Sequence, residues 1–254
     1  MASATGVPER RYSDIESDGA EQRETEPLLG RPGDAAQEEG VPMFRNLVLG
    51  TGILAQMGIL FLVVLIWASV LTKPPLILFS GHPLAQSLAI LTLVQSILTL
   101  QPTHTAEQKR IGQRIHASLN LVAFLLLVAG VTIIEYNKFA SHGAHFHSLH
   151  GYLGVTSCIV LLLQYLVGFT MWATPALYGG EHNAKSIWKY HRYSGYVVLV
   201  LLLATVVSAV DTDYNKNVLK LKLWATGLLS LLVLVGIIPR IQKQKLGFKA
   251  PSLT

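Results

Sequence analysis

The sequence predicts an all-α membrane protein that crosses the bilayer six times. Residues 46–71 carry no charge and are long enough to span a hydrocarbon core of about 30 Å. Apolar residues make up 51% of the chain and charged residues only 14%, and no stretch alternates as the strands of a membrane barrel do. Five further apolar stretches cover residues 82–100, 115–134, 149–172, 192–210 and 223–239. Six spans leave almost no room for a soluble domain in 254 residues.

The segment before the first span differs in composition from the rest. Residues 1–42 hold ten acidic and four basic residues and are rich in Glu, Gly, Pro and Ser. Such a segment cannot bury enough apolar surface to fold, so we expect a disordered tail. The span behind it is not expected to be a cleavable signal peptide. The predicted organisation is therefore a tail (1–42), a six-helix domain (43–242) and a short C-terminal tail (243–254).

Loop charges predict the orientation in the membrane. With both termini in the cytosol, eleven basic residues lie inside and five outside, which follows the positive-inside rule. The inside set is Arg45, Lys109, Arg110, Arg114, Lys185, Lys189, Arg192, Arg240, Lys243, Lys245 and Lys249. The outside set is Lys73, Lys138, Lys216, Lys220 and Lys222, with Asp211 and Asp213 beside the last three.

The tail contains one sequence that matches a sorting signal. Glu24 followed by Leu28 and Leu29 fits an acidic dileucine signal, which cytosolic adaptors read to direct proteins to endosomes, lysosomes or vacuoles. Two adjacent leucines in an acidic tail also arise by chance, and short motifs have many false positives. An endosomal, lysosomal or vacuolar membrane is the predicted location.

Four histidines lie near the starts of four consecutive spans: His82, His116, His150 and His191. Imidazoles within membrane helices are costly and usually functional. Because consecutive spans alternate in direction, His82 and His150 belong to one membrane face, and His116 and His191 belong to the other. Topology therefore predicts two histidine pairs. A single histidine of this kind is more often a hydrogen-bonded member of a bundle, but four equivalent positions favour metal ligation.

Haem b fits two histidines per face better than zinc does. Zinc normally takes three or four protein ligands, whereas haem iron takes two axial imidazoles and a macrocycle. Cys158 is the single cysteine and no C-x-x-C-H is present, which excludes covalent c-type attachment. We therefore expect two haems b per chain, within the four helices that carry the histidines (the second to the fifth).

The residues one turn beyond each histidine repeat the same pattern in both pairs. Gln86 and Asn120 follow His82 and His116, and Gly154 and Gly195 follow His150 and His191, each at i+4 on the same helix face. A glycine removes a side chain where a flat porphyrin must approach the helix. An amide can bond a haem edge or a neighbouring helix.

At these positions the chain resembles the cytochrome b561 family, in particular its small members without an attached soluble domain. The resemblance covers about residues 46–240. It is carried, in order on the second to fifth helices, by Phe79-Ser-Gly-His82-Pro83, Arg114-Ile-His116, Leu149-His150-Gly151, and Lys189-Tyr-His191 with Gly195. It implies bis-histidine haems at both faces, a homodimer, and electron transfer from cytosolic ascorbate to monodehydroascorbate or a ferric chelate. No nucleic-acid partner is expected.

A basic inner surface is the expected dock for ascorbate, which is a monoanion. Thr105-Ala-Glu-Gln108 resembles a capping box, so the third helix should begin about three turns before His116 and carry Lys109 on the face of His116. In the family, basic residues just ahead of the histidines contact the donor, and Arg114 and Lys185 hold comparable positions. We expect these three cations to bind substrate, although each also satisfies the positive-inside rule. No residue is assigned a catalytic role.

The outer face carries a histidine-rich loop with His142, His145 and His147 ahead of His150. These side chains either bind ferric iron, relay a proton, or have no specific role. The loop and the intramembrane histidines leave a metal-ion transporter as a rival of another class, although Glu135, Asp211 and Asp213 lie at helix ends rather than near the midplane. A non-catalytic scaffold would leave four equivalent histidines unexplained. A ferric reductase is the alternative within the favoured class.

Overall fold

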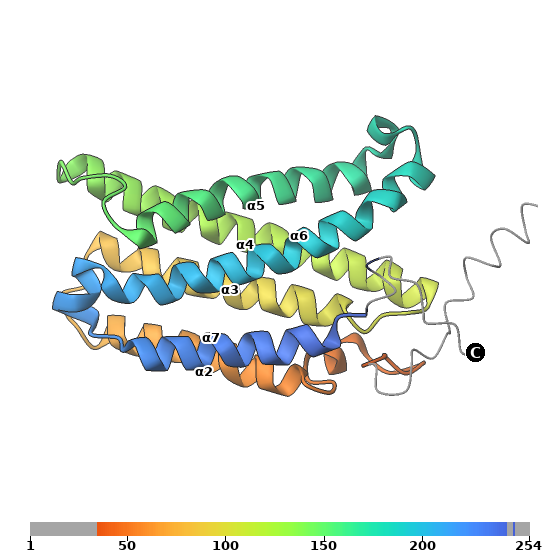
Figure 1. Ribbon diagram of the computed structural model, residues 1–254, viewed down its shortest axis with the longest axis horizontal. Coiled ribbons are helices and arrows are strands. Elements are labelled where there is room, and N and C mark those ends of the chain that lie inside the picture. The colour runs from red at the N-terminus through yellow and green to blue at the C-terminus, as the bar shows by residue number, and fades with distance from the viewer. Residues whose placement is uncertain (1–34, 243–245, 247–254) are drawn as a thin grey trace, which may run out of the picture.

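The computed structural model describes residues 35–242 and 246, and within them six helices are long and apolar enough to cross a membrane, as predicted. All six run along the long axis of the molecule (Figure 1). The helices are α2 (Gly52–Leu71), α3 (Gly81–Leu100), α4 (Ala106–Ala140), α5 (Leu149–Ala173), α6 (Glu181–Ser208) and α7 (Leu223–Ile237). The loops α3–α4 and α5–α6 share one end with the N-terminal segment. The loops α2–α3, α4–α5 and α6–α7 lie at the other. We call these the inner and outer ends, after the predicted orientation.

Two predicted helix starts can be compared with the structure. The start of α4 is confirmed, whereas the first span begins later than predicted. The predicted capping box begins α4: the backbone N–H of Gln108 donates to Thr105 Oγ1 at 3.2 Å, and Gln108 Oε1 accepts from the backbone N–H of Thr105 at 3.4 Å. The first span was predicted to begin at residue 46, but α2 begins at Gly52. Residues Met43–Leu47 form a separate 3-10 helix, η1, and Gly50, between η1 and α2, adopts a left-handed φ of 54°.

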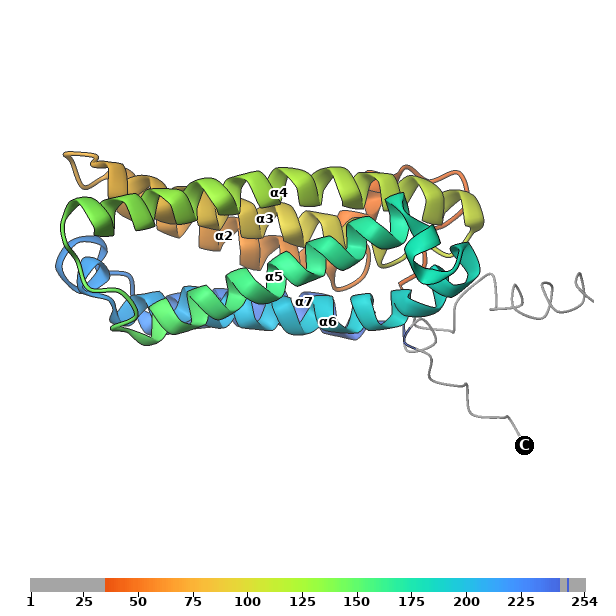
Figure 2. The ribbon, with the colours of Figure 1, turned by 90° about the horizontal axis from the view of Figure 1, so that it is seen from above.

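The helices pack as three close pairs. α3 packs on α4, α5 on α6, and α2 on α7, while α2 also packs on α3 and α6 on α7. Figure 2 shows the helices from above, with α5 crossing between α4 and α6. Glycines bring α2 and α7 together: a Cβ on Gly58 would meet Leu229 O at 2.8 Å. The α3–α4 pair and the α5–α6 pair make few close backbone contacts with each other. These two pairs hold the four histidines between them.

The inner end is closed by a segment that composition assigned to the tail. Gln37 is buried, and its backbone N–H donates to Pro102 O at 3.0 Å. Asn46 Nδ2 donates to Gln37 Oε1 and to Thr99 O, both at 2.9 Å. Residues 35–42 therefore pack against the helices, contrary to the boundary predicted at residue 42. The proposed dileucine signal lies outside the described residues.

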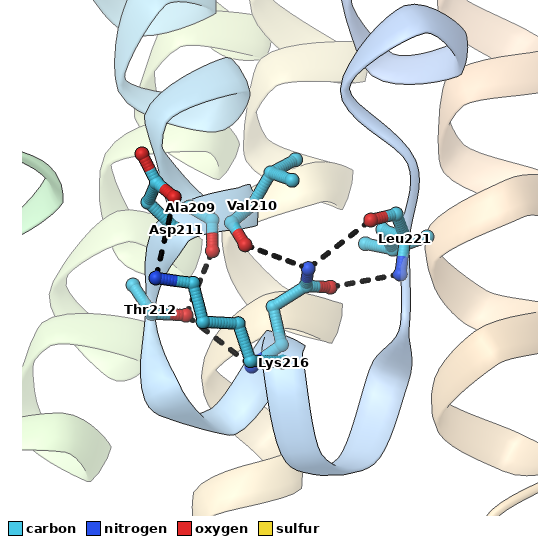
Figure 3. A network of polar contacts seen from close by, with 7 residues as sticks. Ala209, Val210, Asp211, Thr212, Lys216 and Leu221 are labelled. Carbon is cyan, nitrogen blue, oxygen red and sulfur yellow. Dashed lines mark hydrogen bonds and ion pairs between the residues drawn. The ribbon is translucent and has the colours of Figure 1, made fainter.

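The α6–α7 loop at the outer end is held by one buried asparagine, Asn215. Figure 3 shows this loop, with Val210, Lys216 and Leu221 labelled. Asn215 Nδ2 donates to Val210 O at 2.9 Å and to Leu221 O at 3.1 Å, and Asn215 Oδ1 accepts from the backbone N–H of Leu221 at 2.9 Å. Lys216 pairs with Asp211 at 3.3 Å. One outer cation is thus paired with one of the acidic residues beside it.

Candidate functional site

The two outer histidines face each other across the gap between the helix pairs. His82, in the first turn of α3, and His150, in the first turn of α5, have ring centroids 6.2 Å apart and rings nearly perpendicular at 85°. Two metal–nitrogen bonds of about 2 Å each, plus the distance from each ring centre to its ligating nitrogen, add up to roughly 6 Å. The separation therefore matches two imidazoles bound to opposite sides of one metal ion.

His116 on α4 and His191 on α6 form the second pair, nearer the inner end. His191 lies close enough to His116 for charge on one ring to act on the other. Gly168 of α5 lies directly against the His191 ring, because a Cβ there would be 2.8 Å from His191 Cε1. The glycine lets the α5 backbone approach the ring. The structure thus joins the histidines in the two pairs that helix direction predicted.

Three of the four histidines are oriented through Nδ1. His82 Nδ1 lies 2.9 Å from Gly130 O, His150 Nδ1 2.8 Å from Thr205 O, and His116 Nδ1 2.7 Å from Ser96 Oγ. Metal-ligating histidines usually donate their second ring N–H to such groups, which orients the other nitrogen toward the metal. His191 differs: its Nδ1 is buried without a hydrogen-bond partner. Its backbone is held instead, by Gln164 Nε2, which donates to His191 O at 2.7 Å.

Four residues support the histidines through the contacts just described, and all four lie at the same distance along the chain from a histidine. Each lies fourteen positions after a histidine on the same helix and contacts the histidine of the opposite pair. The contacts are Ser96 with His116, Gly130 with His82, Gln164 with His191, and Thr205 with His150. Fourteen residues of α-helix rise about 21 Å. Each helix therefore supplies one histidine to one layer and one support to the other, and the two layers are about 21 Å apart along the helices.

The space around the pairs suits a flat group. A Cβ on Gly154, one turn beyond His150, would meet nothing within 4 Å, as expected for a glycine that leaves room for a porphyrin. Gly195 differs, because its Cβ would approach Gln164 Nε2 at 3.2 Å. The residues present therefore fit haem b on the imidazole separation, the free ring nitrogens and the open cradle at Gly154.

The two amides one turn beyond His82 and His116 bond to protein rather than projecting freely. Gln86 Nε2 donates to Leu127 O at 3.1 Å, which ties α3 to α4. Asn120 Nδ2 donates to Ser96 Oγ at 2.6 Å and to His116 O at 2.7 Å. Of the two roles considered for these amides, the structure shows the bond to a neighbouring helix. Asn120 and Ser96 together build the setting of His116.

Ser96→Ala tests whether this setting matters. The variant removes the hydroxyl that bonds His116 Nδ1, and loss of such a partner typically weakens metal binding by about 10-fold to 100-fold. We expect haem to leave the inner site faster by roughly that factor, measured by transfer to excess apomyoglobin. Ser230→Ala is the matched control, since Ser230 is buried in α7 and its hydroxyl has no hydrogen-bond partner. Equal rates in the two variants would contradict the orienting role of Ser96.

The three predicted substrate cations lie on the exposed inner surface. Lys109 and Arg114 lie on α4, seven and two residues before His116, and Lys185 lies on α6, six residues before His191. Lys185 Nζ is 3.8 Å from Glu181 Oε2 on the same helix. All three are therefore accessible to a soluble anion at the end of the molecule nearest His116 and His191.

Arg240, counted among the inner cations, lies at the inner end but is buried rather than solvated. Its side chain is 3% exposed and Arg240 NH2 donates to Asn46 O at 2.8 Å and to Leu98 O at 3.3 Å. The reason is that α7 ends in a short 3-10 turn, Ile238–Arg240, which carries the side chain back among the helices. The sequence count cannot distinguish a solvated cation from one that caps helix carbonyls.

The outer histidine-rich loop does not gather its imidazoles. His145 Nδ1 lies 3.2 Å from Glu135 Oε2, whereas His147 Nδ1 bonds Ala144 O within the loop. His142 is exposed and has a left-handed φ of 50°. Over residues 35–242 and 246, no three His, Cys, Asp or Glu side chains form a group able to hold a metal ion.

Sequence reasoning missed the supports of the histidines. Ser96, Gln164 and Gly168 are ordinary helix residues, and the partners of His82 and His150 are backbone carbonyls that any residue supplies. The fourteen-residue spacing from each histidine is a signal that a search of the sequence could have used. Without the tertiary contacts, however, nothing marks those positions as paired.

Comparison with known proteins identifies the family. The model of the eukaryotic cytochrome b561 family matches residues 81–215, which contain all four histidines and more than half of the chain. A lysosomal membrane ascorbate-dependent ferrireductase of Rattus norvegicus is 26% identical over 137 residues, 53% of this chain and 53% of the relative. A plasma membrane ascorbate-dependent reductase of Mus musculus is 30% identical over 141 residues, 54% of this chain and 44% of the relative.

A transmembrane ascorbate-dependent reductase of Homo sapiens is 24% identical over 131 residues, 51% of each chain. The chain spans about half the length of the curated relatives that it matches. The match of the family model extends from the first turn of α3 to the loop after α6, and so covers the four helices that build both histidine pairs. The chain belongs to the eukaryotic cytochrome b561 family.

Proposed function

We propose that this protein is an ascorbate-dependent transmembrane oxidoreductase that carries electrons from cytosolic ascorbate to an acceptor on the other side of the membrane. The observation that carries the proposal is the pair of histidine layers. His82 and His150 face each other in one layer, His116 and His191 lie within electrostatic reach of each other in the other, and the layers are about 21 Å apart within a bilayer core of about 30 Å. A relay across the membrane needs one centre near each face.

The histidines would hold two haems b per chain, His82 and His150 at the outer layer and His116 and His191 at the inner layer. A bound haem with two axial imidazoles supplies a one-electron centre with no open coordination position. The chain contributes the rest. Gly130, Thr205 and Ser96 orient three of the rings.

Arg114, Lys185 and Lys109 would bind ascorbate. Their positive charges lie at the end of the molecule closest to the inner histidines and would attract a monoanion from the cytosol. This assignment places both termini in the cytosol, in agreement with the loop charges. The acceptor at the outer face is monodehydroascorbate or a ferric chelate. The names of the rat and mouse relatives support an ascorbate-dependent reductase, and that of the rat relative, a ferrireductase, supports ferric iron.

The name of the rat relative supports a lysosomal or related membrane as the location. A homodimer is proposed from the family resemblance. Neither proposal alters the chemistry assigned to the single chain.

The test is an absorption spectrum of the purified full-length protein, oxidised and after addition of ascorbate, with haem measured per chain. We expect about two haems per chain and sharp b-type bands that intensify with ascorbate. A protein supplied with haem during expression that remains colourless would overturn the proposal. Arg114→Gln should raise the KM for ascorbate without loss of haem, whereas the same change at Lys222, at the outer end, should leave it unchanged.

A further inference from the structure

The most unusual charge in the molecule is the buried guanidinium of Arg240. Its side chain is 3% exposed, and no Asp or Glu of the described residues forms an ion pair with it. Only NH2 is hydrogen-bonded, to two backbone carbonyls, while Nε and NH1 are buried without a partner. A buried cation without a counter-ion projects an electrostatic field much farther than a solvated one.

The local structure explains how this charge is tolerated. Leu98 lies in the last turn of α3, where unpaired carbonyls carry the negative end of the helix dipole. Asn46 O, at the end of η1, supplies the second acceptor. Gly52 makes the room, because a Cβ at that position would collide with Arg240 NH1. Backbone dipoles therefore stabilise the cation but cancel only part of its charge.

Arg240 lies at the level of the inner histidine pair. The carbonyl that it bonds belongs to Leu98, two residues after Ser96, whose hydroxyl bonds His116. Arg240 is also within electrostatic reach of Tyr196, which follows His191 on α6 by five residues. The outer histidines are about 21 Å farther along the helices. Along the helices, Arg240 is therefore closer to the inner layer than to the outer one.

We propose that Arg240 tunes the inner centre: its buried charge raises the midpoint potential of the haem held by His116 and His191 relative to that of the outer haem. The inference rests on the proposed function. A positive charge near a redox centre stabilises the reduced state, which holds one more electron. Arg240 would thus favour acceptance of an electron from ascorbate at the inner face. It acts through space, as a positioning charge rather than a catalytic residue.

The experiment is an optical redox titration of purified full-length protein, wild type against Arg240→Gln. We expect one of the two components to titrate at lower potential in the variant. At a fixed potential the ratio of reduced to oxidised haem in that component should fall by roughly threefold to tenfold, with the other component unchanged. Arg240→Lys keeps the charge and should titrate like wild type.

A matched variant identifies which component moves. Lys138, in the last turn of α4, is within electrostatic reach of both His82 and His150. Lys138→Gln should therefore lower the other component, that of the outer haem. If Arg240→Gln and Lys138→Gln lower the same component, or if Arg240→Gln lowers neither, the inference is overturned.

A second route avoids removing the Arg240 side chain, in case Arg240→Gln does not fold. Gln101 Nε2 donates to Ile237 O and Tyr196 OH beside Arg240, so Gln101→Glu places a negative charge near the guanidinium with almost no change of shape. It should shift the inner component in the same direction as Arg240→Gln. No shift in a variant with full haem content would contradict the inference. Absence of two reducible haems in the wild type would instead overturn the proposed function.

Discussion

His116→Ala is expected to remove one of two haems per chain and to abolish reduction by ascorbate supplied at the cytosolic side. The variant leaves His191 as the only imidazole of the inner layer, so the bis-histidine coordination that binds haem there is lost. The outer layer keeps both ligands, since His82 and His150 face each other about 21 Å away. Haem per chain, measured as the pyridine complex, should therefore fall to about half.

The four single variants together test the pairing. His191→Ala should behave like His116→Ala, whereas His82→Ala and His150→Ala should lose the other haem and keep ascorbate reduction of the remaining one. His182→Ala is the matched control, because His182 is an exposed histidine in the first turn of α6. If His116→Ala retained two haems and full activity, the proposed pairs would be wrong.

Gly168→Leu is the second change with a large expected effect, and it alters no ligand. A Cβ at Gly168 would already lie 2.8 Å from His191 Cε1 and 3.4 Å from Nε2. A leucine side chain must therefore displace the imidazole, and repacking cannot relieve the contact because it comes from the first side-chain atom. We expect loss of the inner haem with the outer haem retained, measured as haem per chain and as a single component in redox titration.

Gly227→Leu on α7 is the control for inserting leucine at a helical glycine, because a Cβ there would meet nothing within 4 Å. Wild-type haem content in Gly168→Leu would show that His191 is not held in the orientation described. Loss of both haems in the two variants alike would indicate a general packing defect rather than an effect on His191.

Much of the architecture follows from sequence patterns with a direct physical cause. Uninterrupted apolar stretches predicted the six spans, since the bilayer core requires them. The capping box at Thr105 and Gln108 predicted the start of α4, because that motif satisfies helix N–H groups locally. The order of the histidines, with alternating helix direction, predicted which of them meet. The family resemblance on the same residues is confirmed by the family match over residues 81–215.

Other features are invisible in the sequence for equally physical reasons. The start of α2 was placed too early, since apolar composition does not show that Gly50 adopts a left-handed backbone. Residues 35–42 look like the rest of an acidic tail, but Gln37 is buried by hydrogen bonds to residues more than sixty positions away.

The sequence by itself determined the membrane class, the six spans and the two faces at which the histidines lie, because hydrophobic length and helix direction are local or additive properties. Only the tertiary structure decided what surrounds them. It brought Gly130, Thr205, Ser96 and Gln164, each fourteen residues after one histidine in the sequence, against a histidine of the opposite pair. It also buried Arg240 on the end of α3. Backbone carbonyls and close contacts between helices have no residue signature, so these features exist only once the helices have packed.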